Sequence, residues 1–405
     1  MKACFIGLGY IGLPTAIISA TSGIDTVGVD INRTIVDKTN AGLLHILEPG
    51  LGDMLKEVVS SGRFRAQTEP ENSDAFFIVV PTPFKENHEP DVSYVETATR
   101  SVIPFLKAGD LFVIESTSPV GTTEKMAEII FAERPELRGK IYVAYCPERV
   151  LPGNVIYELV NNDRVIGGID AASTEKAKEF YGRFVKGQLH GTNARTAEMC
   201  KLTENSSRDV QIAFANELSM ICERAGIDVW ELINLANKHP RVNILWPGAG
   251  VGGHCIAVDP YFITSAFPEE AHIIAEARRI NTFKADWCVD KIESTILRFK
   301  ADGKGECPRV ALMGVAFKPD IDDLRESPAR YIIEKLKVRN PEVDFMTVEP
   351  NVKEIDGLEL TETATAWEKA DIVVFLTAHT PFKQLDREDH RRAERIILDF
   401  AGVFK

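Results

Sequence analysis

A histidine, a cysteine and an aspartate share the glycine-rich stretch GAGVGGHCIAVDP, in which Cys255 follows His254 and Asp259 lies four positions further on. Structural cysteines usually sit among aliphatic residues on a strand or helix, whereas glycines let the backbone approach a neighbour closely. We therefore expect a bound molecule, rather than protein, to approach the glycines of this loop, among them Gly252. Cys255 is then placed to act as a nucleophile.

Cys255 needs an activating environment, because a free thiol titrates near ~8.5 and is mostly protonated at neutral pH. His254 and Lys201 are candidate cationic neighbours, and the amides of the glycine loop could hold an oxyanion. No carboxylate or second histidine lies at metal-ligand spacing from His254. The pattern therefore predicts no metal site.

A second glycine motif, GLGYIG, follows the first expected strand and opens an expected helix, and the next strand ends in the acid of VGVD. The G-x-G-x-x-G spacing allows a tight turn and brings a pyrophosphate close to helix amides, while the acid bonds a ribose hydroxyl. The motif predicts a dinucleotide-binding site. Its residues are Gly7, Gly9, Tyr10, Ile11, Gly12 and Asp30.

The carboxylate of Asp30 favours NAD over NADP, since it would face the additional phosphate of NADP without compensation. Arg33 could contact the adenine, or it could equally be a solvated arginine at a helix start. VPTP and ESTSPVGT follow two further expected strands, so Pro81, Thr82 and Thr117 are placed to line the cofactor at the carboxyl ends of these strands. The alternative is that these prolines and threonines only form turns.

Two polar clusters could serve the chemistry or simply face solvent. YCPERVLPGN ends another strand with Glu148 and Arg149, followed by Val150. A carboxylate there could act as a base, or it could form a surface ion pair. Lys201 and Asn205 lie four residues apart on one face of a helix, which is either a solvated face or a wall beside the glycine loop.

The elements that must position these residues alternate between strand and helix at both ends of the chain. Apolar runs such as KACFIGLG, AFFIVV and LFVIES alternate with helices, and the rhythm returns with RVALMGVAF, VDFMTVEP and DIVVFLTA. Between them, a helix from about Ala194 runs for roughly nine turns to Gly226. The pattern predicts an α/β protein with two doubly wound, Rossmann-like domains, 1–192 and 302–405, joined by a helical domain, 193–301, around this long helix.

Composition excludes several classes of protein. The 405 residues carry a formal net charge of -13, and no Lys/Arg-rich block interleaves with aromatic residues, so no nucleic-acid partner is expected. No apolar run reaches the ~20 residues of a membrane helix, and the first residues lack a signal-peptide cleavage site. The seven cysteines are dispersed without a C-x-x-C pair, which is typical of a reduced protein. We expect a cytoplasmic protein without membrane contact.

Taken together, the motifs resemble those of the UDP-glucose/GDP-mannose dehydrogenases, in the same order and over essentially the whole chain. The shared segments are GLGYIGLP, ESTSPVGT, YCPERVLPG, EMCKLTENSSRDVQIAFANEL, GVGGHCIAVDP and GVAFKPDIDDLRESP. The resemblance implies an NAD domain and a nucleotide-sugar domain on either side of a central helix that forms a dimer. It also implies that a primary alcohol is oxidised twice to a carboxylate. NAD is thus the expected cofactor, and a homodimer or higher homo-oligomer is the expected assembly.

The same resemblance implies roles for individual residues. Cys255 would trap the aldehyde, Glu148 would act as a base for thioester hydrolysis, and Thr117 would lie near the attacking water. The groups implied to handle protons, oxyanion and water are Lys201, Asn205 and Asp259. The expected substrate contacts are Glu148, Arg149, Val150, Lys201, Asn205, Arg241, Gly252, His254, Phe317, Lys318 and Arg325.

Several of these residues bear on the substrate. Lys318 and Arg325 offer positive charge to a pyrophosphate in an otherwise acidic chain. Arg241 resembles the family arginine that reaches a neighbouring subunit's substrate, or it is an ordinary arginine at a helix end. The UDP-glucose and GDP-mannose branches usually carry serine and lysine where this chain has His254 and Val258. The resemblance is greatest to the UDP-N-acetyl-D-mannosamine branch, so a 2-acetamido UDP-sugar is the expected substrate.

Other functions fit parts of the sequence. A UDP-N-acetylglucosamine or UDP-glucose 6-dehydrogenase would share the motifs. A two-electron hydroxyacid dehydrogenase would share the NAD domain but would need neither Cys255 nor a second sheet domain. An NAD-binding redox sensor would oxidise Cys255 itself. Release of two NADH per sugar distinguishes a four-electron enzyme from the hydroxyacid enzyme. The sequence leaves open which epimer of the sugar is oxidised, whether the protein is a dimer or a tetramer, and whether a nucleotide inhibits it.

Overall fold

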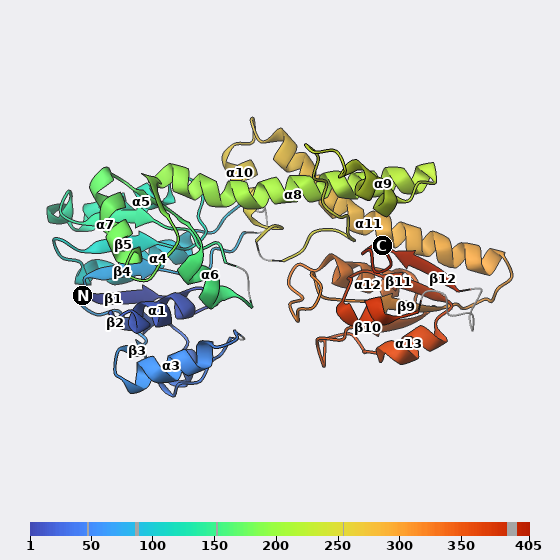
Figure 1. Cartoon of the computed structure of the whole chain (residues 1–405), viewed down its shortest axis with the longest axis horizontal. Coiled ribbons are helices and arrows are strands. Elements are labelled where there is room, and N and C mark those ends of the chain that lie inside the picture. Colours follow the sequence, from blue (N-terminus) through green and yellow to red (C-terminus); the bar gives the residue numbers. More distant parts are fainter. Residues whose placement is uncertain (47, 86–88, 151–152, 254, 387–394) are drawn as a thin grey trace. The chain divides into compact units, whose positions relative to one another are not determined.

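The computed structural model describes residues 1–46, 48–85, 89–150, 153–253, 255–386 and 395–405. The chain divides into two compact units, Met1–Glu204 and Asn205–Lys405. Figure 1 colours the first from blue to green and the second from green to red. The helix α8 (Ala194–Ala225) runs through the boundary between the two units. Within the described ranges, every helix is too short or too polar to span a membrane.

The first unit is built on an eight-stranded sheet with the order β3-β2-β1-β4-β5-β6-β7-β8. Neighbouring strands run parallel apart from β6 and β7, which are antiparallel. The strands are β1 (Lys2–Ile6), β2 (Asp25–Val29), β3 (Phe64–Gln67), β4 (Ala75–Ile78), β5 (Leu111–Ile114), β6 (Tyr142–Tyr145), β7 (Arg164–Gly168) and β8 (Leu189–Asn193).

Helices cover both faces of this sheet. Alternate residues of its central strands point to opposite sides, so Phe5 and Phe77 join one hydrophobic core and Cys4 and Phe76 join another. Helices α1, α3 and α7 contribute to the first core, and α4 and α5 to the second. The helices are α1 (Gly12–Thr21), α2 (Arg33–Asn40), α3 (Leu51–Ser60), α4 (Ser93–Val102), α5 (Thr122–Glu133), α6 (Val155–Asn161) and α7 (Ala171–Tyr181). The doubly wound sheet predicted from the sequence is confirmed.

The second unit joins a helical segment to a smaller sheet. The four parallel strands of this sheet have the order β10-β9-β11-β12. Its helices are the last part of α8, α9 (Val229–Ala236), α10 (Asp259–Ala266), α11 (His272–Ala301), α12 (Pro328–Arg339) and α13 (Thr363–Lys369). Its strands are β9 (Arg309–Met313), β10 (Asp344–Val348), β11 (Ile372–Phe375) and β12 (Ile396–Asp399).

The long helix α11 packs against one face of the second sheet. Val289 and Ile292 share a core with Val310 of β9 and Ile332 of α12, while α13 contributes Trp367 to a second core on the other face. The apolar face of α11 therefore joins the helical segment to the sheet through one shared hydrophobic core.

The long helix expected near the middle of the chain is confirmed as α8, which spans 32 residues. It ends at Gly226, whose φ of +68° is the left-handed conformation that commonly stops a helix. A buried ion pair, Arg278 Nη1 to Asp209 Oδ1 at 2.6 Å, joins α8 to α11. Burial raises the pKa of Asp209, and the guanidinium of Arg278 opposes that effect.

Three strands of the first sheet were not predicted from the sequence. β3 and β8 are short and carry exposed or half-buried positions, and β7 ends in two glycines. None of the three has the apolar run that marks a central parallel strand. The sheet is also mixed in the same place, because β7 enters antiparallel to β6.

Candidate functional site

Each glycine of GLGYIG meets a different steric requirement. Gly7 has a φ of +102°, and a Cβ there would lie 2.4 Å from the carbonyl oxygen of Val79. A Cβ on Gly12 would lie 1.9 Å from the oxygen of Gly7, whereas a Cβ on Gly9 would meet no atom within 4 Å. Gly7 thus permits the turn, Gly12 permits the close start of α1, and Gly9 leaves open space beside the helix N-terminus. This combination fits a pyrophosphate that approaches the backbone at Gly9.

The carboxylate of Asp30 lies directly beside the glycine loop. Its Oδ2 accepts a hydrogen bond from the amide of Leu8 at 3.0 Å, and its Oδ1 accepts one from the amide of Asn32 at 2.9 Å. Asp30 is half-buried at the end of β2, while Arg33 is exposed at the first position of α2. Two backbone amides therefore hold the acid at the edge where a ribose would lie. Tyr10 is exposed and Ile11 packs against the first core.

The segments after β4 and β5 are joined at the same edge of the sheet. Ser116 donates from its hydroxyl to the carbonyl of Val80 at 2.7 Å, which brings VPTP and ESTSPVGT together. The Oγ1 of Thr82 is buried and has no hydrogen-bond partner in the described part of the chain, while Pro81 is exposed and Thr117 is half-buried. The three predicted residues thus lie in the segments that follow β4 and β5, at the carboxyl ends of these strands, and their contact with a cofactor stays a prediction.

Glu198 was not singled out in the sequence, and it occupies the N-terminus of α5. Its carboxylate accepts hydrogen bonds from the amides of Gly121 at 2.6 Å and Thr123 at 2.7 Å. It also accepts one from the hydroxyl of Thr123 at 2.6 Å. An acid on α8 therefore caps a helix of the first unit that lies more than 60 residues earlier in the sequence.

Glu148 forms a buried ion pair rather than a surface one. Its Oε2 lies 3.0 Å from Nη2 of Arg164, and the two side chains are only 8% and 4% exposed. Its Oε1 accepts a hydrogen bond from the amide of Arg149 at 2.6 Å. The guanidinium of Arg149 turns instead to Glu204 of α8, at 2.7 Å. Both oxygens of Glu148 are therefore held, and the side chains of Glu148 and Arg149 have different charged partners. Val150 is half-buried and packs against the first core.

A second buried carboxylate lies near the same guanidinium. Burial raises the pKa of Glu115 to about 7, although the charge of Arg164 and a hydrogen bond from Tyr181 oppose the rise. The hydroxyl of Tyr181 donates to Oε1 of Glu115 at 2.5 Å, and the guanidinium of Arg164 lies over the ring of Tyr181, 5.0 Å from its centroid. Arg164 was missed in the sequence because an arginine at the start of a short strand resembles a surface charge.

Cys255 begins a turn that leads into α10. Its carbonyl accepts hydrogen bonds from the amides of Val258 at 3.0 Å and Asp259 at 2.8 Å. Asp259 is buried at the first position of α10, and its Oδ2 accepts a hydrogen bond from the side-chain amide of Asn205. Two of the three residues expected to handle protons, oxyanion and water are thus in direct contact. Lys201 is half-buried one helical turn before Asn205 on α8.

The glycines before Cys255 make room for protein. A Cβ on Gly252 would lie 2.4 Å from the carbonyl oxygen of Glu326, and one on Gly253 would lie 2.8 Å from the ring of Phe317. The amide of Gly253 also donates to the carbonyl of Arg325 at 3.1 Å. Protein atoms therefore approach Gly252 and Gly253 closely, and a substrate contact at Gly252 stays a prediction. The close neighbour is the loop between β9 and α12, which the sequence places more than 60 residues away.

That loop carries the residues expected to hold a pyrophosphate. Lys318 is exposed and Phe317 is half-buried against Gly253. The guanidinium of Arg325 pairs with the carboxylate of Asp323 at 2.6 Å and 2.9 Å. A phosphate bound by Arg325 would therefore share the guanidinium with Asp323.

The start of the glycine loop is held by a polar network between two helices. The amide of Gly248 donates to Oδ1 of Asn216 at 2.9 Å, and the side-chain amide of Asn216 donates to Asn281 of α11, also at 2.9 Å. Asn281 in turn donates to the carboxylate of Asp209 at 2.8 Å. Arg241 is exposed after α9, and His254 lies outside the described residues. Among the described residues, no cluster of His, Cys, Asp and Glu has the arrangement of a metal site.

Matches to family models cover three successive parts of this chain. Residues 1–185 match the NAD binding domain of the UDP-glucose/GDP-mannose dehydrogenase family, residues 195–283 its central domain, and residues 311–405 its UDP binding domain. The chain therefore belongs to the UDP-glucose/GDP-mannose dehydrogenase family. It is an NAD-dependent oxidoreductase of UDP-sugars, so the expected family and cofactor are confirmed. The hydroxyacid dehydrogenase and the redox sensor are set aside.

Individual relatives with named activities match almost the whole length of this chain. The chain is 50% identical to an NDP-N-acetyl-D-galactosaminuronic acid dehydrogenase of Ralstonia nicotianae, over 98% of this chain and 95% of the relative. It is 49% identical to the UDP-N-acetyl-D-mannosamine dehydrogenase of Escherichia coli, over 99% and 98%. The solved structure of a UDP-D-ManNAc dehydrogenase from Pyrococcus horikoshii is similar over 100% of this chain and 96% of its own, with a TM-score of 0.89 and 40% identity.

Proposed function

We propose that this protein oxidises the C6 alcohol of UDP-N-acetyl-D-mannosamine to the carboxylate of UDP-N-acetyl-D-mannosaminuronate. The loop GGHCIAVDP supports this choice, since it departs from the UDP-glucose and GDP-mannose pattern at His254 and Val258. The names of the Ralstonia and Escherichia coli relatives also refer to 2-acetamido sugars. The Ralstonia relative makes the galacto epimer the second candidate.

The contact that carries the proposed chemistry is the hydrogen bond from Asn205 to Asp259, one turn after Cys255. An aldehyde has no hydride to give until a nucleophile adds to its carbon. We assign that addition to the sulfur of Cys255, which forms a tetrahedral thiohemiacetal whose oxygen is held by Lys201 and Asn205. Loss of a hydride then leaves a thioester on Cys255.

Water must cleave the thioester to release the acid and restore the thiol. We assign the base to Glu148, with Asp259 as the alternative, and we place Thr117 near the attacking water. Arg164 holds Glu148 in one orientation through the buried ion pair. Each sugar therefore gives up two hydrides and consumes one water.

NAD, when bound, accepts the hydride in each of the two oxidations. The residues that would hold it fit the group, because Gly9 leaves open space at the start of α1 and Asp30 is fixed beside the glycine loop. Lys318 and Arg325 would hold the diphosphate of the sugar nucleotide, and the further proposed substrate contacts are Phe317, Arg149, Val150, Gly252 and His254. Arg241 would reach the site of a neighbouring subunit, which makes the active form a homodimer or larger. The division into domains 1–192, 193–301 and 302–405 is part of this proposal.

A substrate panel tests the proposal. We would measure NADH released per sugar with UDP-N-acetylmannosamine, UDP-N-acetylglucosamine, UDP-N-acetylgalactosamine and UDP-glucose. We expect two NADH per molecule and the highest kcat/KM for UDP-N-acetylmannosamine. One NADH per sugar would contradict the thioester mechanism, and a preference for another sugar would replace the substrate.

A further inference from the structure

The loop between β9 and α12 is held in a conformation that its residues do not favour. Asp320 has a φ of +61° and Glu326 a φ of +50°, and they are the non-glycine residues with positive φ in the described part of the chain. Such conformations persist only where the surroundings over-determine them, and they concentrate at ligand sites. Asp320 lies two residues after Lys318, and Glu326 directly follows Arg325. We therefore looked for what holds Asp320.

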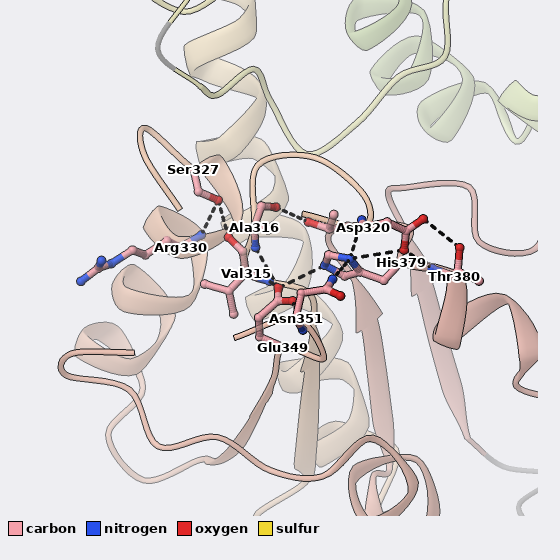
Figure 2. A network of polar contacts seen from close by, with 10 residues as sticks. Val315, Ala316, Asp320, Ser327, Arg330, Glu349, Asn351, His379 and Thr380 are labelled. Atoms are coloured by element: carbon pink, nitrogen blue, oxygen red, sulfur yellow. Dashed lines mark hydrogen bonds and ion pairs between the residues drawn. The ribbon is translucent and has the colours of Figure 1, made fainter. Parts of the chain in front are cut away.

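A buried histidine holds the backbone of Asp320. The amide of Asp320 donates to Nδ1 of His379 at 2.9 Å, and His379 is fully buried in the segment that follows β11. Because a backbone N–H can only donate, Nδ1 is the acceptor and the proton of the neutral ring lies on Nε2. The carboxylate of Asp320 is held as well, by the amide of Thr380 at 2.7 Å and its hydroxyl at 2.8 Å. Figure 2 shows these contacts around Asp320 and His379.

The other face of the histidine meets a buried carboxylate. Nε2 of His379 lies 3.1 Å from Oε2 of Glu349, whose side chain is fully buried. The same oxygen accepts hydrogen bonds from the amides of Val315 at 2.8 Å and Ala316 at 2.9 Å. Burial opposes ionisation of Glu349, but the hydrogen bonds from His379 and the backbone amides keep its pKa below the usual range. The buried pair of Glu349 and His379 thus binds the loop backbone on both sides of Lys318 (Figure 2). Glu349 accepts from Val315 and Ala316 before it, and His379 accepts from Asp320 after it.

We propose that His379 is a positioning residue for the nucleotide part of the substrate. It holds residues 315–320 so that Lys318 faces the diphosphate and Phe317 stays packed against Gly253. The inference rests on the proposed function, because it takes Lys318 as a diphosphate contact. The side chains of His379 and Glu349 are buried, so we assign them the role of fixing the loop before the ligand arrives rather than of contacting it.

Two substitutions separate the contacts of the two ring nitrogens of His379. Nδ1 accepts from the amide of Asp320 and lies 2.9 Å from the side-chain nitrogen of Asn351, whereas Nε2 contacts Glu349. In His379→Asn the side-chain oxygen lies near the position of Nδ1 and keeps an acceptor for Asp320, while the link to Glu349 is lost. In His379→Gln the terminal amide lies near the position of Nε2 and keeps the donor to Glu349, while the amide of Asp320 loses its acceptor. We would measure UDP affinity by titration calorimetry, KM for the UDP-sugar, NAD affinity and Tm for the full-length protein.

We expect His379→Gln to bind UDP roughly tenfold more weakly and to show a raised KM, since a buried hydrogen bond is lost and Asp320 can relax. We expect His379→Asn to stay within about threefold of wild type, and NAD affinity to be unchanged in both. Thr347→Val is the matched control, because it alters a fully buried side chain of β10, in the same sheet and outside the loop, and it should leave UDP affinity unchanged.

Three results would overturn the proposal. They are equal UDP affinity in wild type and His379→Gln, equal weakening in the Asn and Gln variants, and loss in the Asn variant alone. Should His379→Gln fail to fold, Thr380→Val removes the hydroxyl from Asp320 at an exposed position, and unchanged UDP affinity there would also overturn it. Failure of the proposed function is distinct, because wild type would then release no NADH from any UDP-sugar, whatever the variants do to UDP binding.

Discussion

The buried carboxyl of Glu115 makes the stability of the first unit depend on pH. Burial raises the pKa of Glu115 to about 7 from its usual 4.5, so between these values the folded protein binds a proton that the unfolded chain releases. The contribution of protonated Glu115 to the free energy of unfolding is therefore fully present below about pH 4.5. It is lost as the pH rises through about 7. Replacing Glu115 with glutamine removes the ionisation and keeps an oxygen that can accept from Tyr181.

The size of the effect follows from the two pKa values. At about 1.4 kcal/mol per pH unit, a rise from 4.5 to about 7 corresponds to about 3 kcal/mol once Glu115 is ionised. The side chain is only 3% exposed, so solvent screening does not reduce this figure. Relative to Glu115→Gln, wild type should lose roughly 2–3 kcal/mol of unfolding free energy between pH 5 and pH 8.

Tryptophan fluorescence would miss this change, because Trp230, Trp246, Trp287 and Trp367 all lie in the second unit. Hydrogen exchange of peptides from β5 and α7 reports on the region around Glu115, and comparing both proteins at the same pH cancels the intrinsic rate. Tyr181→Phe serves as a contrast, since losing its hydrogen bond should raise the pKa of Glu115 further and steepen the fall. A difference between wild type and Glu115→Gln that stays constant from pH 5 to pH 8 would refute the reasoning.

Three further predictions concern the chemistry. Asp30→Ser should shift preference from NAD towards NADP by roughly 10- to 100-fold, because a charged hydrogen bond to ribose is lost; an unchanged ratio of kcat/KM would mean that Asp30 does not face the ribose. Mixing Arg241→Ala with Cys255→Ser subunits should restore activity in the heterodimer, and confirmed heterodimers without activity would place Arg241 outside the neighbour's site. Glu148→Gln should accumulate a substrate adduct visible by mass spectrometry, and Cys255→Ala should abolish both the adduct and four-electron turnover; full turnover of Cys255→Ala would sink the mechanism.

The parts of the site that were predicted are those whose contacts are local in sequence. Gly7, Gly9 and Gly12 act within one turn, and Asp30 ends the strand that pairs with the strand before them. The long helix was predicted to within a residue of its end, because its periodicity is sustained and Gly226 stops it. Local steric and hydrogen-bonding rules suffice for such features.

The parts that were missed depend on residues brought together by the topology. Arg164 reaches Glu148 because β7 lies beside β6, and β7 has too little apolar character to be recognised as a strand of the sheet. His379 reaches Asp320 because β9 and β11 are neighbours. In each case an ionisable side chain that looks like a surface group is fully or almost fully buried. Its partner lies 16 or more residues away, where no periodicity connects the two.

The close approach of Gly252 and Gly253 to the loop of Phe317 has a consequence for how mutations should act. The turn of Cys255 and the loop of Lys318 lie in the same compact unit and share a backbone hydrogen bond, from Gly253 to the carbonyl of Arg325. A change that loosens the loop of Lys318 therefore also loosens the backbone two residues before Cys255, the proposed nucleophile. Defects in UDP binding and in thioester formation should accordingly rise together along this loop. Defects in NAD binding at the glycine turn of the first unit should arise separately, because no residue of that turn takes part in this contact.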